Sequence, residues 1–204
     1  MLRFEEIVQR SRPIQTGEHL FRAGDPFRSV AAVRVGCFKS YLIDSEGQEH
    51  VSGFSWPGEI VGLDAIHSNR HNVNVIALDT SAVCGLTFQS ISSLAGLIPE
   101  LQSEVLCRMS RQISELTIAA GDFSADERVA KFLMSVSNGF ASRGYSDCEF
   151  TLPMTRKDLA SYLRLASETV SRVLARFQRD GWLLIDRQRI RICDFRKLRK
   201  LAGV

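Results

Sequence analysis

Long apolar runs are missing from this sequence of 204 residues, and none approaches the ~20 residues that a membrane-spanning helix needs. This absence excludes a transmembrane protein. The first six residues carry charge where a secretory signal has an apolar core, so we expect a cytoplasmic protein. The five cysteines lie far apart and form no Cys-x-x-Cys pair, which argues against a disulfide framework and a structural zinc site.

Signatures of catalysis are also missing from the sequence. It contains no P-loop, no dinucleotide fingerprint, no recognisable nucleophile–base pair and no cluster of metal ligands. We therefore expect a protein that is not an enzyme and that holds no metal. Hydrophobic residues make up 45% of the chain and charged residues 24%, which is enough apolar material to bury a core.

Charge is divided unevenly along the chain. The net charge is only +3, but residues 1–150 carry 13 Lys and Arg against 18 Asp and Glu. Residues 151–204 carry 13 Lys and Arg against 5 Asp and Glu. The basic end indicates a C-terminal module that binds a polyanion, although charge alone also fits a basic solvated surface.

Residues 13–90 have the pattern of an all-β domain. Short apolar or alternating runs, such as residues 30–35, 38–43 and 73–78, are separated by Gly, Pro and Asp turn signals. This spacing predicts a sandwich, barrel or jelly roll. Residues 1–10 are expected to form a short helix before that domain, and residues 124–127 a capping box that opens a helix over residues 128–140.

A helix is predicted over residues 100–120, where neither Pro nor Gly interrupts the chain. Its apolar residues form one narrow seam at near-heptad spacing, which favours pairing with a second copy of the chain. A helix that packs on the β-domain is the alternative. The predicted dimerisation residues are Leu101, Val105, Met109, Ile113, Leu116 and Ala120.

Residues 155–181 predict two short helices joined by a tight turn, which is a helix-turn-helix. Thr155 and Asp158 have the spacing of a capping box for the first helix. Ser167 is expected to cap the second helix, and Gly181 to end it. One side of the second helix is apolar at the spacing of a packed face: Val170, Val173, Leu174 and Phe177.

The opposite side of the second helix is small and polar, which suits the reading of base edges in DNA. Arginine can donate two hydrogen bonds to guanine, glutamate can accept one from cytosine, and serine adapts to several bases. Arg176 and Arg179 suit phosphates, and residues 182–192 form a predicted basic wing with its turn at residues 186–188. The predicted DNA-binding residues are Glu168, Ser171, Arg172, Thr155, Arg156, Ser167, Thr169 and Arg176. A packing module without a ligand is the weaker alternative, since this polar face serves no packing purpose.

Residues 154–158 and 167–174 resemble the helix-turn-helix signature of the CRP/FNR family of bacterial transcription regulators, and their Glu-x-x-Ser-Arg face is typical of the FNR branch. Residues 58–66 also resemble that branch. The resemblance implies an α+β chain with a β-roll similar to cyclic nucleotide-binding domains (residues 1–96), a long dimerisation helix (97–123) and a winged helix-turn-helix (124–204). It further implies a homodimer that binds an inverted repeat similar to TTGAT-N4-ATCAA, contacts RNA polymerase through β-roll loops and responds to oxygen or redox state.

The same resemblance bears on cofactors. The Arg-Ser pair of cyclic nucleotide binders is replaced by Asn72 and Val73, so we expect no cyclic AMP binding. Cys84 stands at the fourth ligand position of the [4Fe–4S] cluster of oxygen sensors, and it would act as a ligand only if cysteines preceded this sequence. We expect no cofactor in this chain and interpret Cys84 as a small buried residue.

The alternative function is a regulator controlled by nitric oxide, haem, another small ligand or thiol oxidation, with Cys148 and Cys193 as the thiols near the DNA-binding module.

Overall fold

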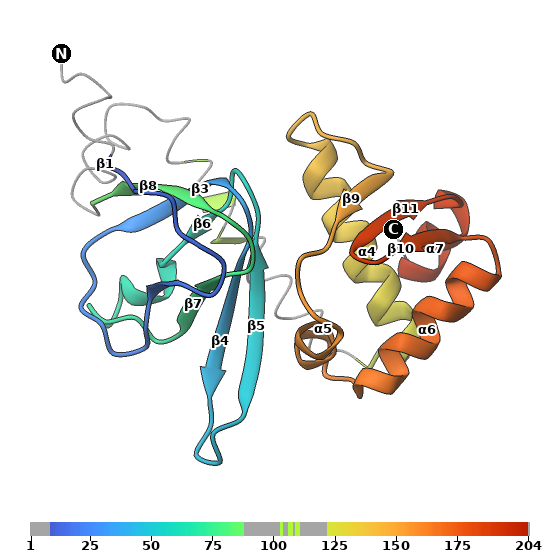
Figure 1. Ribbon diagram of the computed structural model, residues 1–204, viewed down its shortest axis with the longest axis horizontal. Coiled ribbons are helices and arrows are strands. Elements are labelled where there is room, and N and C mark those ends of the chain that lie inside the picture. Colours follow the sequence, from blue (N-terminus) through green and yellow to red (C-terminus); the bar gives the residue numbers. More distant parts are fainter. Residues whose placement is uncertain (1–8, 88–102, 104–105, 108, 111–121, 204) are drawn as a thin grey trace. The chain divides into compact units, whose positions relative to one another are not determined.

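The computed structural model describes residues 9–87, 103, 106–107, 109–110 and 122–203 (Figure 1). The chain divides into two compact units, residues 1–118 and 119–204. The predicted dimerisation helix lies almost wholly outside the described residues, as do five of its six seam residues. The sixth, Met109, is helical and 41% exposed.

In its described part, the N-terminal unit contains two four-stranded antiparallel sheets, with the strand orders β1-β8-β3-β6 and β2-β7-β4-β5. Its elements are β1 (Gln9–Arg10), β2 (His19–Phe21), β3 (Val30–Val35), β4 (Phe38–Ile43), β5 (Glu49–Ser55), β6 (Ile60–Val61), the 3-10 helix η1 (Leu63–Ala65), β7 (Asn74–Ala77) and β8 (Ala82–Leu86). Both sheets contribute buried side chains to one core, among them Val33 and Val83 from one sheet and Phe38 and Val75 from the other. The predicted β-roll is therefore confirmed.

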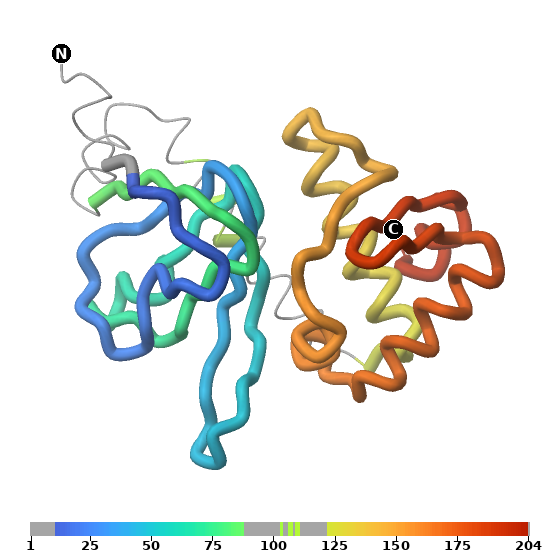
Figure 2. Tube along the Cα trace, in the orientation of Figure 1, coloured from blue at the N-terminus to red at the C-terminus, as the bar shows by residue number. Residues whose placement is uncertain are grey.

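Each of the three apolar runs that the sequence singled out in the N-terminal unit contains a strand, and the run over residues 73–78 is one residue longer than β7 at each end. β3 and β4 have the predicted bounds, and the glycine between them, Gly36, has the left-handed φ of 87° that a tight turn needs. The β4–β5 hairpin extends beyond the rest of this unit (Figure 2). The helix expected over residues 1–10 is wrong at its end, because Gln9–Arg10 form β1. Pairing with β8 gives these residues hydrogen-bond partners that a short isolated helix lacks.

The C-terminal unit contains four helices and a three-stranded sheet with the strand order β10-β11-β9 among the residues that the structure describes. Its elements are α4 (Ala125–Ala141), β9 (Glu149–Thr151), α5 (Arg156–Leu163), α6 (Ser167–Arg179), β10 (Leu183–Asp186), β11 (Arg189–Ile192) and α7 (Phe195–Ala202). Helix α4 packs against both α6 and α7, so it is the common support of this unit.

The capping box before α4 is present as predicted. Ser124 accepts a hydrogen bond from the backbone N–H of Glu127, and the Glu127 carboxylate accepts one from the N–H of Ser124. The helix begins at Ala125, three residues before the predicted start at Arg128. The reason is that the cap residue itself supplies the carbonyl for the first helical hydrogen bond, from Arg128 N to Ser124 O at 3.0 Å.

Candidate nucleic-acid interface

Helix α5 is the first helix of the predicted pair, and both halves of its capping box form. Thr155 Oγ1 accepts a hydrogen bond from Asp158 N at 3.0 Å, and Thr155 N donates to Asp158 Oδ2 at 3.0 Å. The helix ends at Leu163, and the C-cap residue Arg164 has a φ of 54°, which turns the chain in the left-handed conformation. Residues 164–166 therefore make the tight turn that the sequence predicted.

Helix α6 buries the side that was predicted to be packed. Its four apolar residues, Val170, Val173, Leu174 and Phe177, are each at most 5% exposed. Gly181 follows the helix with a φ of 75°, so the predicted stop is confirmed.

The predicted cap of α6 is wrong. Ala166 is the N-cap residue and makes no side-chain capping bond, while Ser167 is already the first helical residue. The Ala166 carbonyl accepts from the backbone N–H groups of Thr169 and Val170, so the helix starts one residue earlier than a Ser167 cap would allow. Ser167 is half-buried, and its role in DNA binding stays a prediction.

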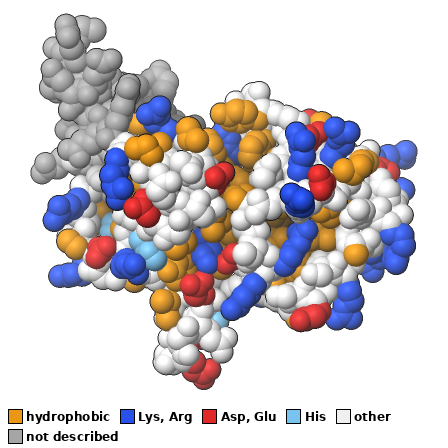
Figure 3. All heavy atoms as spheres, in the orientation of Figure 1, with side chains coloured by type: hydrophobic (Ala, Val, Ile, Leu, Met, Phe, Trp, Pro, Cys, Tyr) orange, Lys and Arg blue, Asp and Glu red, His pale blue; other side chains and the backbone are white. Residues whose placement is uncertain are grey.

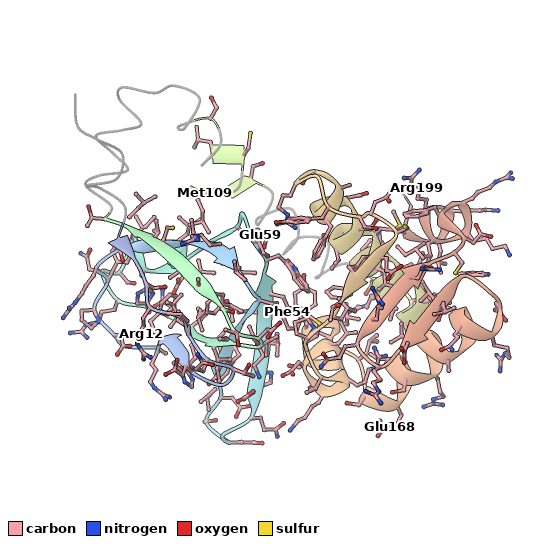
Figure 4. All side chains as sticks on the ribbon, turned by 45° about the horizontal axis from the view of Figure 1, so that its top comes forward. Arg12, Phe54, Glu59, Met109, Glu168 and Arg199 are labelled. Carbon is pink, nitrogen blue, oxygen red and sulfur yellow. The ribbon has the colours of Figure 1, made fainter. Side chains whose placement is uncertain are left out.

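The predicted base-reading residues lie on the free side of α6. Glu168, Ser171 and Arg172 are exposed, and Glu168 points away from the helix into solvent (Figure 4). Arg172 Nε lies 3.4 Å from the Glu168 carbonyl oxygen, one turn back along the helix. The structure thus brings these side chains onto one accessible face, while their contact with bases stays a prediction.

The predicted wing forms as a hairpin of β10 and β11. Asp186 pairs with Arg189 as the last residue of β10, so the turn consists of Arg187 and Gln188 alone. The prediction of a turn over residues 186–188 was one residue too long. Arg187 has a φ of 54°, which lets two residues reverse the chain.

A pocket joins the start of α5 to this turn. Arg156 is half-buried there, and burial lowers the pKa of its guanidinium. Arg187 lines the same pocket from the wing, so two cations border it. Such a combination suits an anionic oxygen. The pocket is lined by Leu152, Met154, Thr155, Arg156, Arg187, Gln188 and Ile190.

Two of the three wing arginines are held by one carboxylate. Glu149 lies 2.6 Å from Arg189 Nε and 2.7 Å from Arg191 Nη2. The hydrogen bonds from Arg191 lower the pKa of Glu149, so it stays ionised. Lys and Arg outnumber acidic side chains on the visible surface of this unit (Figure 3). In the wing, however, Glu149 of β9 offsets part of the positive charge of Arg189 and Arg191.

Arg176, one of the predicted phosphate contacts, is bound to another residue. Its guanidinium forms an ion pair with Asp126 in the first turn of α4. Sequence reasoning missed Asp126, because the two residues lie 50 positions apart and no local pattern links them. The pair borders a groove lined by Ala125, Asp126, Thr169, Arg172, Val173 and Arg176.

In the N-terminal unit, the segment that corresponds to the Arg-Ser pair of cyclic nucleotide binders is tied to protein groups. Arg70 Nη1 donates to a backbone carbonyl of the neighbouring turn at 2.7 Å, and Asn72 N donates to Asp64 Oδ2 at 2.7 Å. Between them His71 is only 5% exposed and stacks on Phe21 with the ring centroids 3.6 Å apart.

Cys84 lies in the middle of β8, with Arg10 of β1 and Ala32 of β3 as its partners in register. Neither neighbour is a cluster ligand. Cys37 is 2% exposed, and burial raises the pKa of its thiol, which disfavours the thiolate that binds iron. The cysteine donors in the described part of the chain therefore do not fit a four-cysteine cluster.

Two family models match this chain. Residues 11–96 match the cyclic nucleotide-binding domain, and residues 127–201 match the Crp-like helix-turn-helix domain. Electron transport regulator A of Shewanella oneidensis is 40% identical over 202 residues, which cover 98% of this chain and 81% of that protein. The fumarate and nitrate reduction regulatory protein of Escherichia coli is 41% identical over 202 residues, with shares of 98% and 81%. The chain belongs to the CRP/FNR family of transcription regulators.

A solved structure shows the same CRP/FNR fold. FixK2 from Bradyrhizobium japonicum superposes with a TM-score of 0.81 at 24% identity, covering 97% of this chain and 98% of FixK2. The two named relatives are regulators rather than enzymes. Within the residues that the structure describes, no helix combines the length and the apolar character needed to cross a membrane.

Proposed function

We propose that this CRP/FNR regulator binds as a homodimer to an inverted repeat similar to TTGAT-N4-ATCAA. Arg172 reads guanine, Glu168 helps to fix the adjoining pair from the other strand, and Ser171 discriminates thymine. Two-fold symmetry accounts for the palindrome, with half-sites about 34 Å apart. The pocket between α5 and the wing, with Thr155 and Arg156, would hold the DNA backbone.

The observation that carries this proposal is the two-sided character of α6. Its apolar side is fully packed, so the helix is held in place, while Glu168, Ser171 and Arg172 face solvent. Their side chains have donors and acceptors that match base edges, and none of them is needed for packing. These features favour a recognition helix that contacts DNA bases over a helix whose exposed side has no binding role.

The test is fluorescence anisotropy of aerobically purified protein on the TTGAT-N4-ATCAA duplex and on a scrambled duplex. We expect selective binding of the first. Arg172→Ala should cost about 1–3 kcal/mol on that duplex and much less on the scrambled one, since a base contact is lost. Arg179→Ala, an exposed residue later in α6, should weaken both duplexes alike. Equal loss on both duplexes for Arg172→Ala would reduce this residue to a phosphate contact.

The signal is proposed to be oxygen, redox state or anaerobic metabolism, in line with the names of the two relatives. We propose that cyclic AMP does not act on this chain, because Arg70 and Asn72 already bind protein groups. Micromolar binding of cyclic AMP in calorimetry would contradict this. We also propose that this chain builds no [4Fe–4S] cluster from its own cysteines, and iron reconstitution under anaerobic conditions tests that point.

A second candidate is control by a small ligand or by thiol oxidation. Cys193 is exposed, and Cys148 lies next to β9 in the DNA-binding unit. Loss of DNA binding on mild oxidation, absent in a Cys148→Ser, Cys193→Ser variant, would favour this alternative. Contact with RNA polymerase is proposed for residues 51–54, which lie within strand β5, and for residues 62–65, which include the 3-10 helix η1. A transcription assay with purified polymerase tests that contact.

A further inference from the structure

Arg176 and Asp126 join the recognition helix to the support helix at the edge of the predicted DNA-binding face. Arg176 lies one turn after Arg172, so both side chains leave the same side of α6 and line the groove beside α4. The side chains of Arg176 and Asp126 are 43% and 34% exposed. The pair is therefore formed in contact with solvent and within reach of a competing anion.

The energetics favour exchange of this pair. An ion pair that solvent reaches is weak, because water screens both charges. A DNA phosphate offers the same guanidinium an equivalent charge-assisted bond and also releases condensed counterions. Arg176 can thus give up Asp126 at little cost once a phosphate is near. The carboxylate that remains faces a polyanion, which adds to the cost of binding.

We propose that Asp126 limits the affinity of this protein for DNA by holding Arg176, and that Arg176 exchanges this carboxylate for a DNA phosphate on binding. The inference rests on the proposed function, since it assumes that α6 meets DNA. Asp126 acts here through Arg176 and is a positioning residue. A phosphate contact carries no base information, so the effect must be the same on every sequence.

The experiment is a double-mutant cycle in the full chain, with DNA affinity measured over a range of salt concentrations on both duplexes. Asp126→Asn should tighten binding about 2- to 5-fold on both duplexes, because Arg176 no longer has a competitor. Arg176→Gln should weaken binding and reduce the slope of log affinity against log salt by about 0.9. In the Arg176→Gln background, Asp126→Asn should tighten binding no more than the control substitution Asp147→Asn does, because only the repulsion between one carboxylate and DNA is then removed.

The matched control is Asp147→Asn, which makes the same charge change in the exposed loop beyond the far end of α4. The Asp147 backbone carbonyl accepts a hydrogen bond from Ser137 Oγ, 11 residues after Asp126 in α4, so the control lies roughly 16 Å along the helix from Asp126. Asp126→Asn leaves the Ser124–Glu127 capping box intact, and circular dichroism melting checks that each variant is folded.

Three results overturn the inference. They are an Asp126→Asn effect equal to that of Asp147→Asn, an Asp126→Asn effect larger than the control's in the Arg176→Gln background, and an unchanged salt slope for Arg176→Gln. Failure of the proposed function looks different. If the wild-type protein binds both duplexes equally, it does not recognise the DNA sequence and the proposed function fails. The double-mutant cycle can still be measured on either duplex, so the role of Asp126 is tested separately.

Discussion

At the scale of single residues, His71 links stability to pH. Its ring is buried against Phe21, and burial lowers its pKa although Asp64 and Asp25 act in the opposite direction. The unfolded chain therefore takes up a proton at a higher pH than the folded unit does. Stability is complete above the ordinary histidine value of 6.5 and falls as the pH drops from there to the lowered pKa.

This predicts that His71→Phe loses less stability between pH 7.5 and pH 5.5 than the wild type does. Phenylalanine keeps the stack on Phe21 and cannot be protonated. Each unit contains one tryptophan, so urea unfolding followed by Trp56 fluorescence in a Trp182→Phe background reports on the N-terminal unit. Burial also lowers the pKa of His19, so the stability of both the wild type and the His71→Phe variant falls to some extent at acidic pH. Identical pH profiles for the two proteins would contradict the role of His71.

Gly36 gives a second prediction at this scale. A Cβ added at Gly36 would lie 2.0 Å from Ser81 Oγ and 2.8 Å from Ser81 Cα, and its φ is 87°. At Gly47, whose φ is 79°, an added Cβ meets nothing within 4 Å. Gly47→Ala should therefore cost about 1 kcal/mol of unfolding free energy from backbone strain alone, and Gly36→Ala roughly 2–4 kcal/mol. Equal costs in the same Trp56 assay would mean that the Ser81 backbone yields easily.

At the scale of elements, the helix caps separate two serines that look alike in sequence. Ser124 caps α4 through its side chain, whereas Ser167 lies inside the first turn of α6 without a capping bond. Ser124→Ala should destabilise the C-terminal unit by about 1 kcal/mol, and Ser167→Ala by less than about 0.5 kcal/mol. Unfolding followed by Trp182 fluorescence in a Trp56→Phe background measures both. If Ser167→Ala lowers the free energy of unfolding as much as Ser124→Ala does, Ser167 caps the helix after all.

The elements also show how far the sequence could be interpreted. The capping boxes at Ser124 and Thr155 were predictable because their signal lies within four residues and depends only on local hydrogen bonds between side chains and the backbone. The packed and free faces of α6 followed from helical periodicity. The clamp of Glu149 on the wing arginines and the Asp126–Arg176 pair were not predictable, because they join elements that only the tertiary fold brings together.

At the scale of the whole molecule, the proposed homodimer predicts the effect of charge in the seam. Ile113 lies outside the described residues and belongs to the predicted seam. In a dimer of the Ile113→Glu variant, the two copies would therefore place their glutamates next to each other. This variant should sediment as a monomer and lose most of its affinity for the inverted repeat. Ser110→Glu, an exposed helical position beside Met109, adds the same charge outside the seam and should stay dimeric. A dimeric Ile113→Glu variant would remove the proposed interface.

Helix α4 supports both α6 and α7, and its length has a geometric consequence. With 17 residues it is about 25 Å long, so a tilt of about 10° around its first turn moves its last turn by about 4 Å. A hydrogen bond to a base tolerates displacements of only a few tenths of an ångström around ~3 Å. Because Arg172 and Arg176 line one groove with the first turn of α4, a tilt around that turn moves these arginines much less than the far end of the helix, so the proposed DNA contacts are the least disturbed by it.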